Sequence, residues 1–120
     1  ADQRLELLSL THSEARRADL APEIVLALIE VESGFNSYAV SSAGAQGIMQ
    51  VMPFWKTQIG RPQDNLINTQ TNLRYGCTIL KHYLDLEQGR LAEALARYNG
   101  SYGQTWYAER VLDAWAERWR

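Results

Sequence analysis

Two glutamates close to the longest apolar run of the chain are the residues whose spacing points most directly to chemistry. Glu30 and Glu32 are two positions apart, so on a helix they face very different directions. Glu30 falls on the side of Glu23, which we expect to face solvent, whereas Glu32 falls on the apolar stripe that includes Leu28. Burial disfavours the charged form of a carboxyl group and raises its pKa. Glu32 therefore has the setting of a general acid that works near neutral pH.

An ordinary explanation of Glu32 stays open at this stage. A carboxylate at a helix end can also reach water or cap a neighbouring backbone group. Other chemistries have weaker support, because His12 and His82 are far apart and neither pairs with Cys77 at a zinc-ligand spacing. The chain has no calcium-loop pattern and no G-x-S-x-G nucleophile elbow. We expect no metal and no cofactor.

The remaining short motifs carry little information by themselves. Gly44–Gly47 is a G-x-x-G without a basic, strand-rich context, and Asn99–Ser101 matches the glycosylation acceptor pattern. Aromatic side chains could stack on the C–H faces of sugar rings. Trp115 and Trp119 lie at helical spacing, which favours core packing for both. The aromatic residues near breaks in the pattern stay open: Trp55, Tyr38, Tyr98, Tyr102 and Tyr107.

Helical periodicity dominates the chain and supplies the elements that must position these residues. The segment at residues 35–51 is rich in Ser, Asn and Gly, which predicts a loop with one short strand or β-hairpin at 48–51. The sequence predicts an all-α fold. Its helices are expected at 3–17, from Pro22 to about Ser33, from Pro53 to about Gly60, from Asn68 or Thr69 to Gly89, from Leu91 to about Tyr98, and from about Thr105 onward.

Composition limits the class of protein. The 120 residues suit one domain, which we expect to span 1–120, and 46% apolar with 22% charged residues is typical of a globular chain. The net charge of −2 argues against a nucleic-acid partner. The longest apolar run, Ile24–Ile29, is far short of the roughly 20 residues of a membrane span. The single cysteine cannot form an internal disulfide, so the fold must depend on its core.

Three blocks of the sequence together resemble the lytic transglycosylase SLT domain, glycoside hydrolase family 23. The first block is Leu28–Asn36, followed by Ser41–Gly44. The second is Gly47–Pro53, and the third is Ala96–Gly100, which is similar to the family's A-x-Y-N-x-G motif. The blocks occur in the family's order, and the similarity runs over most of the chain.

The resemblance implies roles for individual residues. Glu32 matches the family's catalytic acid/base, and Tyr98 matches the tyrosine that hydrogen-bonds the catalytic carboxyl. Five further positions match the family's site motifs and are expected to bind substrate: Ser33, Ser41, Gln50, Met52 and Asn99.

The resemblance also implies a fold, a substrate and a location. The expected fold is a compact, lysozyme-like helical domain with a substrate cleft. The expected substrate is the peptidoglycan glycan strand, cut between N-acetylmuramic acid and N-acetylglucosamine. The protein would act as a monomer in the periplasm or cell envelope of a bacterium, after export.

A single carboxyl group can catalyse glycan cleavage if a group of the substrate replaces the second carboxylate. Glycosidases usually use two carboxylates, and nothing marks Asp64, the nearest loop acid, as a partner of Glu32. The N-acetyl group of the substrate can replace the second carboxylate. The muramyl 6-hydroxyl would then close on C1 and leave a 1,6-anhydromuramyl end.

Three other functions remain as alternatives. A hydrolytic muramidase of the goose-lysozyme type would add water, and a further carboxylate placed to activate that water would favour it. A non-catalytic peptidoglycan-binding module would be marked by loss of the acid, and Glu32 is present. A purely structural helical domain would leave the three blocks unexplained.

Overall fold

The computed structural model describes residues 2–120, so Ala1 lies outside it. Within those residues the chain is helical with connecting loops, which confirms the predicted all-α fold. The elements, in order, are α1 (Asp2–Arg17), α2 (Pro22–Ser33), α3 (Trp55–Ile59), α4 (Thr69–Leu86), α5 (Leu91–Asn99), α6 (Trp106–Ala114) and the π-helix η1 (Trp115–Trp119).

Local sequence signals set several helix ends where they were predicted. Pro22 opens α2, and Gly34 ends it with φ of 59°, a conformation that glycine adopts at little cost. The Asn68 side chain caps α4 by accepting a hydrogen bond of 3.0 Å from the Thr71 N–H. One start differs from the prediction. The chain at Pro53 forms tight turns, with the Trp55 N–H bonded to Met52 O at 3.1 Å, and α3 begins only at Trp55.

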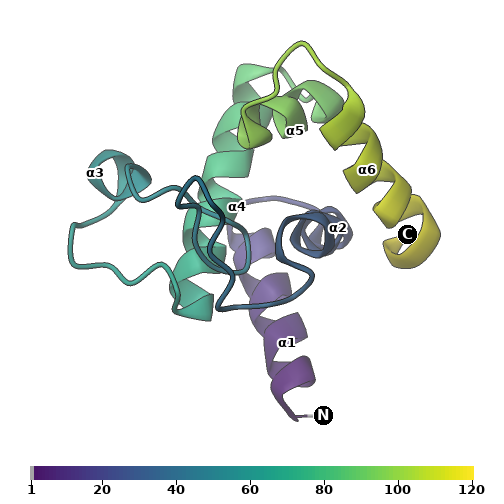
Figure 1. Cartoon of the computed structure of the whole chain (residues 1–120). Helices are drawn as coiled ribbons and strands as arrows, with labels where there is room; N and C mark the ends of the chain where they lie inside the picture. Colours follow the sequence, from purple (N-terminus) through teal and green to yellow (C-terminus); the bar gives the residue numbers. More distant parts are fainter. Residues whose placement is uncertain (1) are drawn as a thin grey trace.

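Helix α2 occupies the middle of the molecule. Figure 1 shows it almost end-on, with α1, α4 and α6 around it and the loop after it in front. Its inward face is fully buried at Val25, Ala27, Leu28 and Ile29. Because α1, α6 and η1 pack against α2, a side chain near the C-terminal end of α2 is held by partners from distant parts of the sequence.

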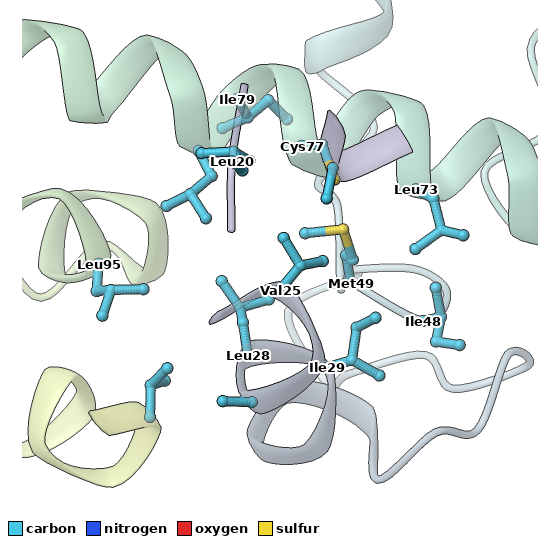
Figure 2. Close-up of a cluster of buried hydrophobic side chains, with 14 of the residues drawn as sticks. Leu20, Val25, Leu28, Ile29, Ile48, Met49, Leu73, Cys77, Ile79 and Leu95 are labelled. Carbon is cyan, nitrogen blue, oxygen red and sulfur yellow. The ribbon is translucent and has the colours of Figure 1, made fainter. Parts of the chain in front are cut away.

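A loop residue completes the core between α2 and α4. Figure 2 shows Met49 pointing into the space between Val25 and Cys77. Met49 is fully buried, and Gly76 on α4 makes room for it: a Cβ at Gly76 would lie 2.3 Å from the Met49 sulfur. The loop between α2 and α3 is therefore anchored in the core, which gives it a fixed position beside α2.

The β-hairpin expected at 48–51 is not formed, and that prediction was wrong. In the described residues this segment makes two isolated antiparallel bridges, Val40 with Gln46 and Gln46 with Val51. The backbone turns at Gly44, Gly47 and Gln50, all with positive φ. These turns reverse the chain too often for two strands to pair over several residues.

The C-terminal helices follow the predicted apolar stripe. Val111 is fully buried, and Leu112, Trp115 and Trp119 are half-buried against the core. The Trp119 ring lies 5.8 Å from the ring of Phe35, which follows α2. The core assignment of both tryptophans is confirmed. Their packing ties η1 to the end of α2.

Candidate active site

Glu32 lies in the last turn of α2, on the inward side that the helix pattern predicted. Its side chain is half-buried, and its carboxylate Oε2 accepts a hydrogen bond of 2.5 Å from the Tyr107 hydroxyl. Burial raises the pKa of Glu32 to about 6, although the hydrogen bond from Tyr107 acts in the opposite direction. The carboxyl group can therefore exist as acid and as base close to neutral pH.

Glu30 has a different environment from the one predicted. It does not simply face water: it forms an ion pair with Arg118 and accepts a hydrogen bond of 3.0 Å from the Trp119 indole N–H. These contacts, led by the hydrogen bond from Arg118, hold the pKa of Glu30 below its usual range. Two carboxyl groups on one helix turn thus have pKa values displaced in opposite directions, and only that of Glu32 is raised.

The hydrogen bond that the resemblance assigned to Tyr98 is made by another tyrosine. The Tyr98 hydroxyl donates to the backbone carbonyl of Met49 at 2.7 Å, whereas Tyr107 donates to Glu32. Burial, with the nearby charge of Glu32, raises the pKa values of both tyrosines well above 10. The sequence placed both tyrosines near helix breaks, but only tertiary packing decides which hydroxyl reaches the carboxylate.

Two of the expected substrate-binding side chains donate hydrogen bonds to the backbone of the loop between α2 and α3. The Ser33 hydroxyl donates to the carbonyl of Ile48 at 2.7 Å. The Gln50 amide donates to the carbonyls of Ala39 at 3.1 Å and Gly47 at 2.9 Å. Ser33 therefore fastens the loop to the end of α2 beside Glu32, and Gln50 fixes the turns within the loop.

Of the other three expected substrate-binding residues, Ser41 and Met52 lie in the loop between α2 and α3. Asn99 follows Tyr98 and is the last residue of α5. The Ser41 hydroxyl accepts a hydrogen bond of 3.0 Å from the Ala45 N–H and closes a turn. The Asn99 amide donates to the Ser101 hydroxyl at 3.0 Å after the end of α5. Met52 is half-buried at the end of the loop.

Asn72 is a supporting residue that sequence reasoning missed. It is fully buried in α4 and accepts a hydrogen bond of 2.8 Å from the Met49 N–H. Its amide donates to the carbonyls of Gln46 at 2.8 Å and Leu66 at 2.7 Å. The signal in the sequence was an asparagine inside a predicted helix, where this residue type is unfavourable. Its burial in the structure requires that the amide has partners.

Asp64, the loop acid considered in the sequence analysis, has hydrogen-bond partners of its own. In the described part of the chain, no group of three or more His, Cys, Asp and Glu could hold a metal ion. Asp64 accepts hydrogen bonds from the Tyr75 hydroxyl and from the Arg61 N–H, at 3.1 Å for the latter. Burial raises the pKa of Cys77 to about 12, so it is inert as a nucleophile.

A surface groove of about 800 Å³ lies near α2 but is separate from this site. It runs beside the first turns of α1 and reaches Phe35 and Trp119. Its lining does not include Glu32, Tyr98 or Tyr107. The candidate active site is therefore defined by the acid and its tyrosines, not by the volume of a groove.

The family match and the relatives found by sequence comparison are all transglycosylases. Residues 9–115 match the model of the transglycosylase SLT domain. Membrane-bound lytic murein transglycosylase C of Actinobacillus pleuropneumoniae serotype 5b (strain L20) is 48% identical over 48 residues, which are 40% of this chain and 13% of that protein. The protein of the same description from Yersinia pestis (strain Pestoides F) is 30% identical over 112 residues, covering 80% of this chain and 31% of that one.

A solved structure agrees with the sequence relatives. An inactive variant of lytic transglycosylase Slt from Pseudomonas aeruginosa, with one glutamate replaced by glutamine, superposes with a TM-score of 0.69 at 28% identity. The match covers 93% of this chain but 18% of that chain. This chain thus spans well under a third of the solved neighbour. None of the helices in residues 2–120 combines the length and the hydropathy that a membrane span requires.

Proposed function

This chain belongs to the transglycosylase SLT domain family, and we propose that it is a lytic transglycosylase that cleaves peptidoglycan with Glu32 as the single acid/base. One observation carries the proposal: the Glu32 carboxyl group is half-buried beside Tyr107, with its pKa raised to about 6. Two comparisons support the proposal. The relatives are called lytic murein transglycosylases, a name that describes action on murein. The solved neighbour is inactive when one of its glutamates is replaced by glutamine.

The first step is protonation of the leaving group. Glu32 gives its proton to the oxygen that links C1 of N-acetylmuramic acid to N-acetylglucosamine, and the C1–O bond breaks. The N-acetyl carbonyl oxygen of the muramyl sugar supplies an electron pair to C1, which replaces the second carboxylate of ordinary glycosidases. Glu32 is left ionised.

The second step closes a ring without water. The ionised Glu32 takes the proton of the muramyl 6-hydroxyl while its oxygen attacks C1 and displaces the N-acetyl oxygen. The product has a 1,6-anhydro bond, and Glu32 is protonated again. An intramolecular hydroxyl has a high effective concentration, so it can compete with water when the sugar ring is held correctly.

Tyr107 positions the acid in this mechanism. Its hydroxyl donates to Oε2 of Glu32, which leaves Oε1 available to carry the proton that is transferred. Because the pKa of Tyr107 is well above 10, its hydroxyl stays protonated and remains a donor throughout the cycle.

We assign the remaining residues to holding the substrate. Tyr98 positions the loop beside Glu32, because its hydroxyl donates a hydrogen bond of 2.7 Å to the Met49 carbonyl. Residues at the end of α2, in the loop after it and at the end of α5 shape the walls that contact the glycan: Ser33, Ser41, Gln50, Met52 and Asn99. The protein acts as a monomer in the periplasm or envelope, where peptidoglycan lies.

Mass spectrometry of the muropeptides released from purified peptidoglycan tests the reaction. Products with a 1,6-anhydro end, lighter than hydrolytic products by one water, are expected. Reducing ends would replace the proposal by a goose-type muramidase with Glu32 still as acid. Release of neither product by a folded sample would favour a binding module.

A further inference from the structure

Two aromatic side chains are exposed where the chain passes from α5 into α6: Tyr102 lies between the two helices, and Trp106 is the first residue of α6. Tyr102 is 55% exposed and Trp106 is 47% exposed. Figure 1 shows this segment looping out beyond the ends of α5 and α6. The exposed faces of these two rings are available for contact with a ligand.

Neighbouring groups orient both rings. The Trp106 indole N–H donates to the Gln104 side chain at 3.0 Å, and its ring meets the ring of Tyr107 edge-on at 5.9 Å. The guanidinium of Arg97 lies 4.0 Å from the centre of the Tyr102 ring, and Arg97 is itself paired with the buried Glu87. The rings are therefore oriented before any ligand arrives, which lowers the entropy cost of binding.

The Trp106 ring lies one aromatic ring away from the acid. Tyr107 connects the two, because its ring touches Trp106 and its hydroxyl bonds to Glu32 at 2.5 Å. A glycan strand with its scissile bond at Glu32 would thus pass close to the exposed indole. The indole N–H already has a partner, so the exposed part of the side chain offers mainly its apolar face.

We propose that Trp106, flanked by Tyr102, is a stacking platform for a sugar ring of the glycan strand that is bound at Glu32. The apolar face of an aromatic ring suits the C–H face of a pyranose. The inference rests on the proposed function, since it takes a glycan as the occupant. It adds a specificity contact that neither the sequence blocks nor the hydrogen bonds of the acid supply.

Calorimetric binding of a peptide-free tetrasaccharide of alternating N-acetylglucosamine and N-acetylmuramic acid tests the platform. The measurements use the Glu32→Gln background, so that the ligand is not consumed. Trp106→Ala is expected to weaken binding roughly five- to tenfold, the loss of one aromatic contact. Trp106→Phe keeps a flat ring and should restore most of the affinity. Leu86→Ala removes a similarly exposed apolar side chain from the end of α4 and serves as the matched control.

The outcomes separate the platform from the reaction. Equal affinity of Trp106→Ala and its parent, or no tetrasaccharide binding by the parent, overturns the platform. Loss of affinity that Trp106→Phe does not restore also counts against stacking. Release of 1,6-anhydro ends by the intact protein is measured separately, and its absence would refute the proposed function instead.

Discussion

Tyr107 and Glu32 are 75 residues apart in the chain, yet the tyrosine hydroxyl donates a 2.5 Å hydrogen bond to the glutamate carboxylate. Helix α6 brings this hydroxyl to the last turn of α2. Burial raises the pKa of Glu32, and the hydrogen bond from Tyr107 lowers it, so the value of about 6 reflects both effects. The acidity of Glu32 therefore depends on how two distant helices pack.

Replacing Tyr107 by Phe should raise the pKa of Glu32 further. The bond to the ionised carboxylate is lost, and such bonds are worth about 1.5–3 kcal/mol, or roughly one pKa unit or more. An acid catalyst works when protonated, so the alkaline limb of the pH–rate profile should move upward, with a roughly tenfold lower rate at the optimum. Tyr98→Phe is the comparison: we expect a lower rate without that shift, because its hydroxyl bonds to Met49. Identical limbs in all three proteins would remove Tyr107 from the mechanism.

Glu32→Gln should abolish cleavage and leave the fold intact. Glutamine keeps the shape of the side chain and can accept the hydrogen bond of Tyr107, but it has no proton to transfer. Release of 1,6-anhydro muropeptides measures activity, and circular dichroism measures the fold. Wild-type turnover in this variant would mean that another group is the acid.

The same variant should become more stable than the parent as pH rises, because only the parent carries the ionisable Glu32. The pKa of Glu32 is about 6 in the folded protein against 4.5 when accessible, so the fold favours the protonated form. The stability that this group contributes is complete below pH 4.5 and is lost as pH rises through 6. At pH 7 the ionised group costs about 2 kcal/mol, which Glu32→Gln should recover.

Urea unfolding of both proteins at several pH values checks this linkage. Glu14 and Glu87 have lowered pKa values, so they contribute the opposite trend in both proteins, and it cancels in the difference. A difference in unfolding free energy that stays constant from pH 4 to pH 7 would show that the pKa of Glu32 is not raised.

Glu30→Gln should affect stability more than catalysis. It removes the charge that pairs with Arg118 and weakens the bond from the Trp119 indole. The pair is partly exposed, with Glu30 at 26% and Arg118 at 50%, so the expected loss is about 1 kcal/mol or less. Thermal unfolding measures the loss, and muropeptide release should stay within twofold of the parent. A loss of activity like that of Glu32→Gln would show that the acid has been misassigned.

Asn72→Ala should loosen the loop that borders the site. It leaves the Met49 N–H and the carbonyls of Gln46 and Leu66 without their partner. Each buried unpaired group costs about 1–3 kcal/mol, so we expect a loss of at least roughly 3 kcal/mol in urea unfolding. Asn68→Ala removes one capping bond at the exposed start of the same helix and should cost only about 1 kcal/mol. Equal losses in the two variants would contradict the role given to Asn72.

Features that depend on neighbours along the chain could be predicted from the sequence alone. Pro22, Gly34 and Asn68 set helix ends because capping and backbone conformation are local. The 100° turn per residue separated the faces of Glu30 and Glu32, and the raised pKa expected of Glu32 is found. Local geometry was sufficient for these predictions.

Which distant groups meet depends on how the helices pack, and the sequence did not predict it. Tyr98 and Tyr107 both flank the break after α5, and helix packing gives the carboxylate to Tyr107 and the Met49 carbonyl to Tyr98. The partner of Glu30 is likewise near the C-terminus, in η1. Such contacts form because buried polar groups must be paired, and the nearest partner in space can come from any part of the chain.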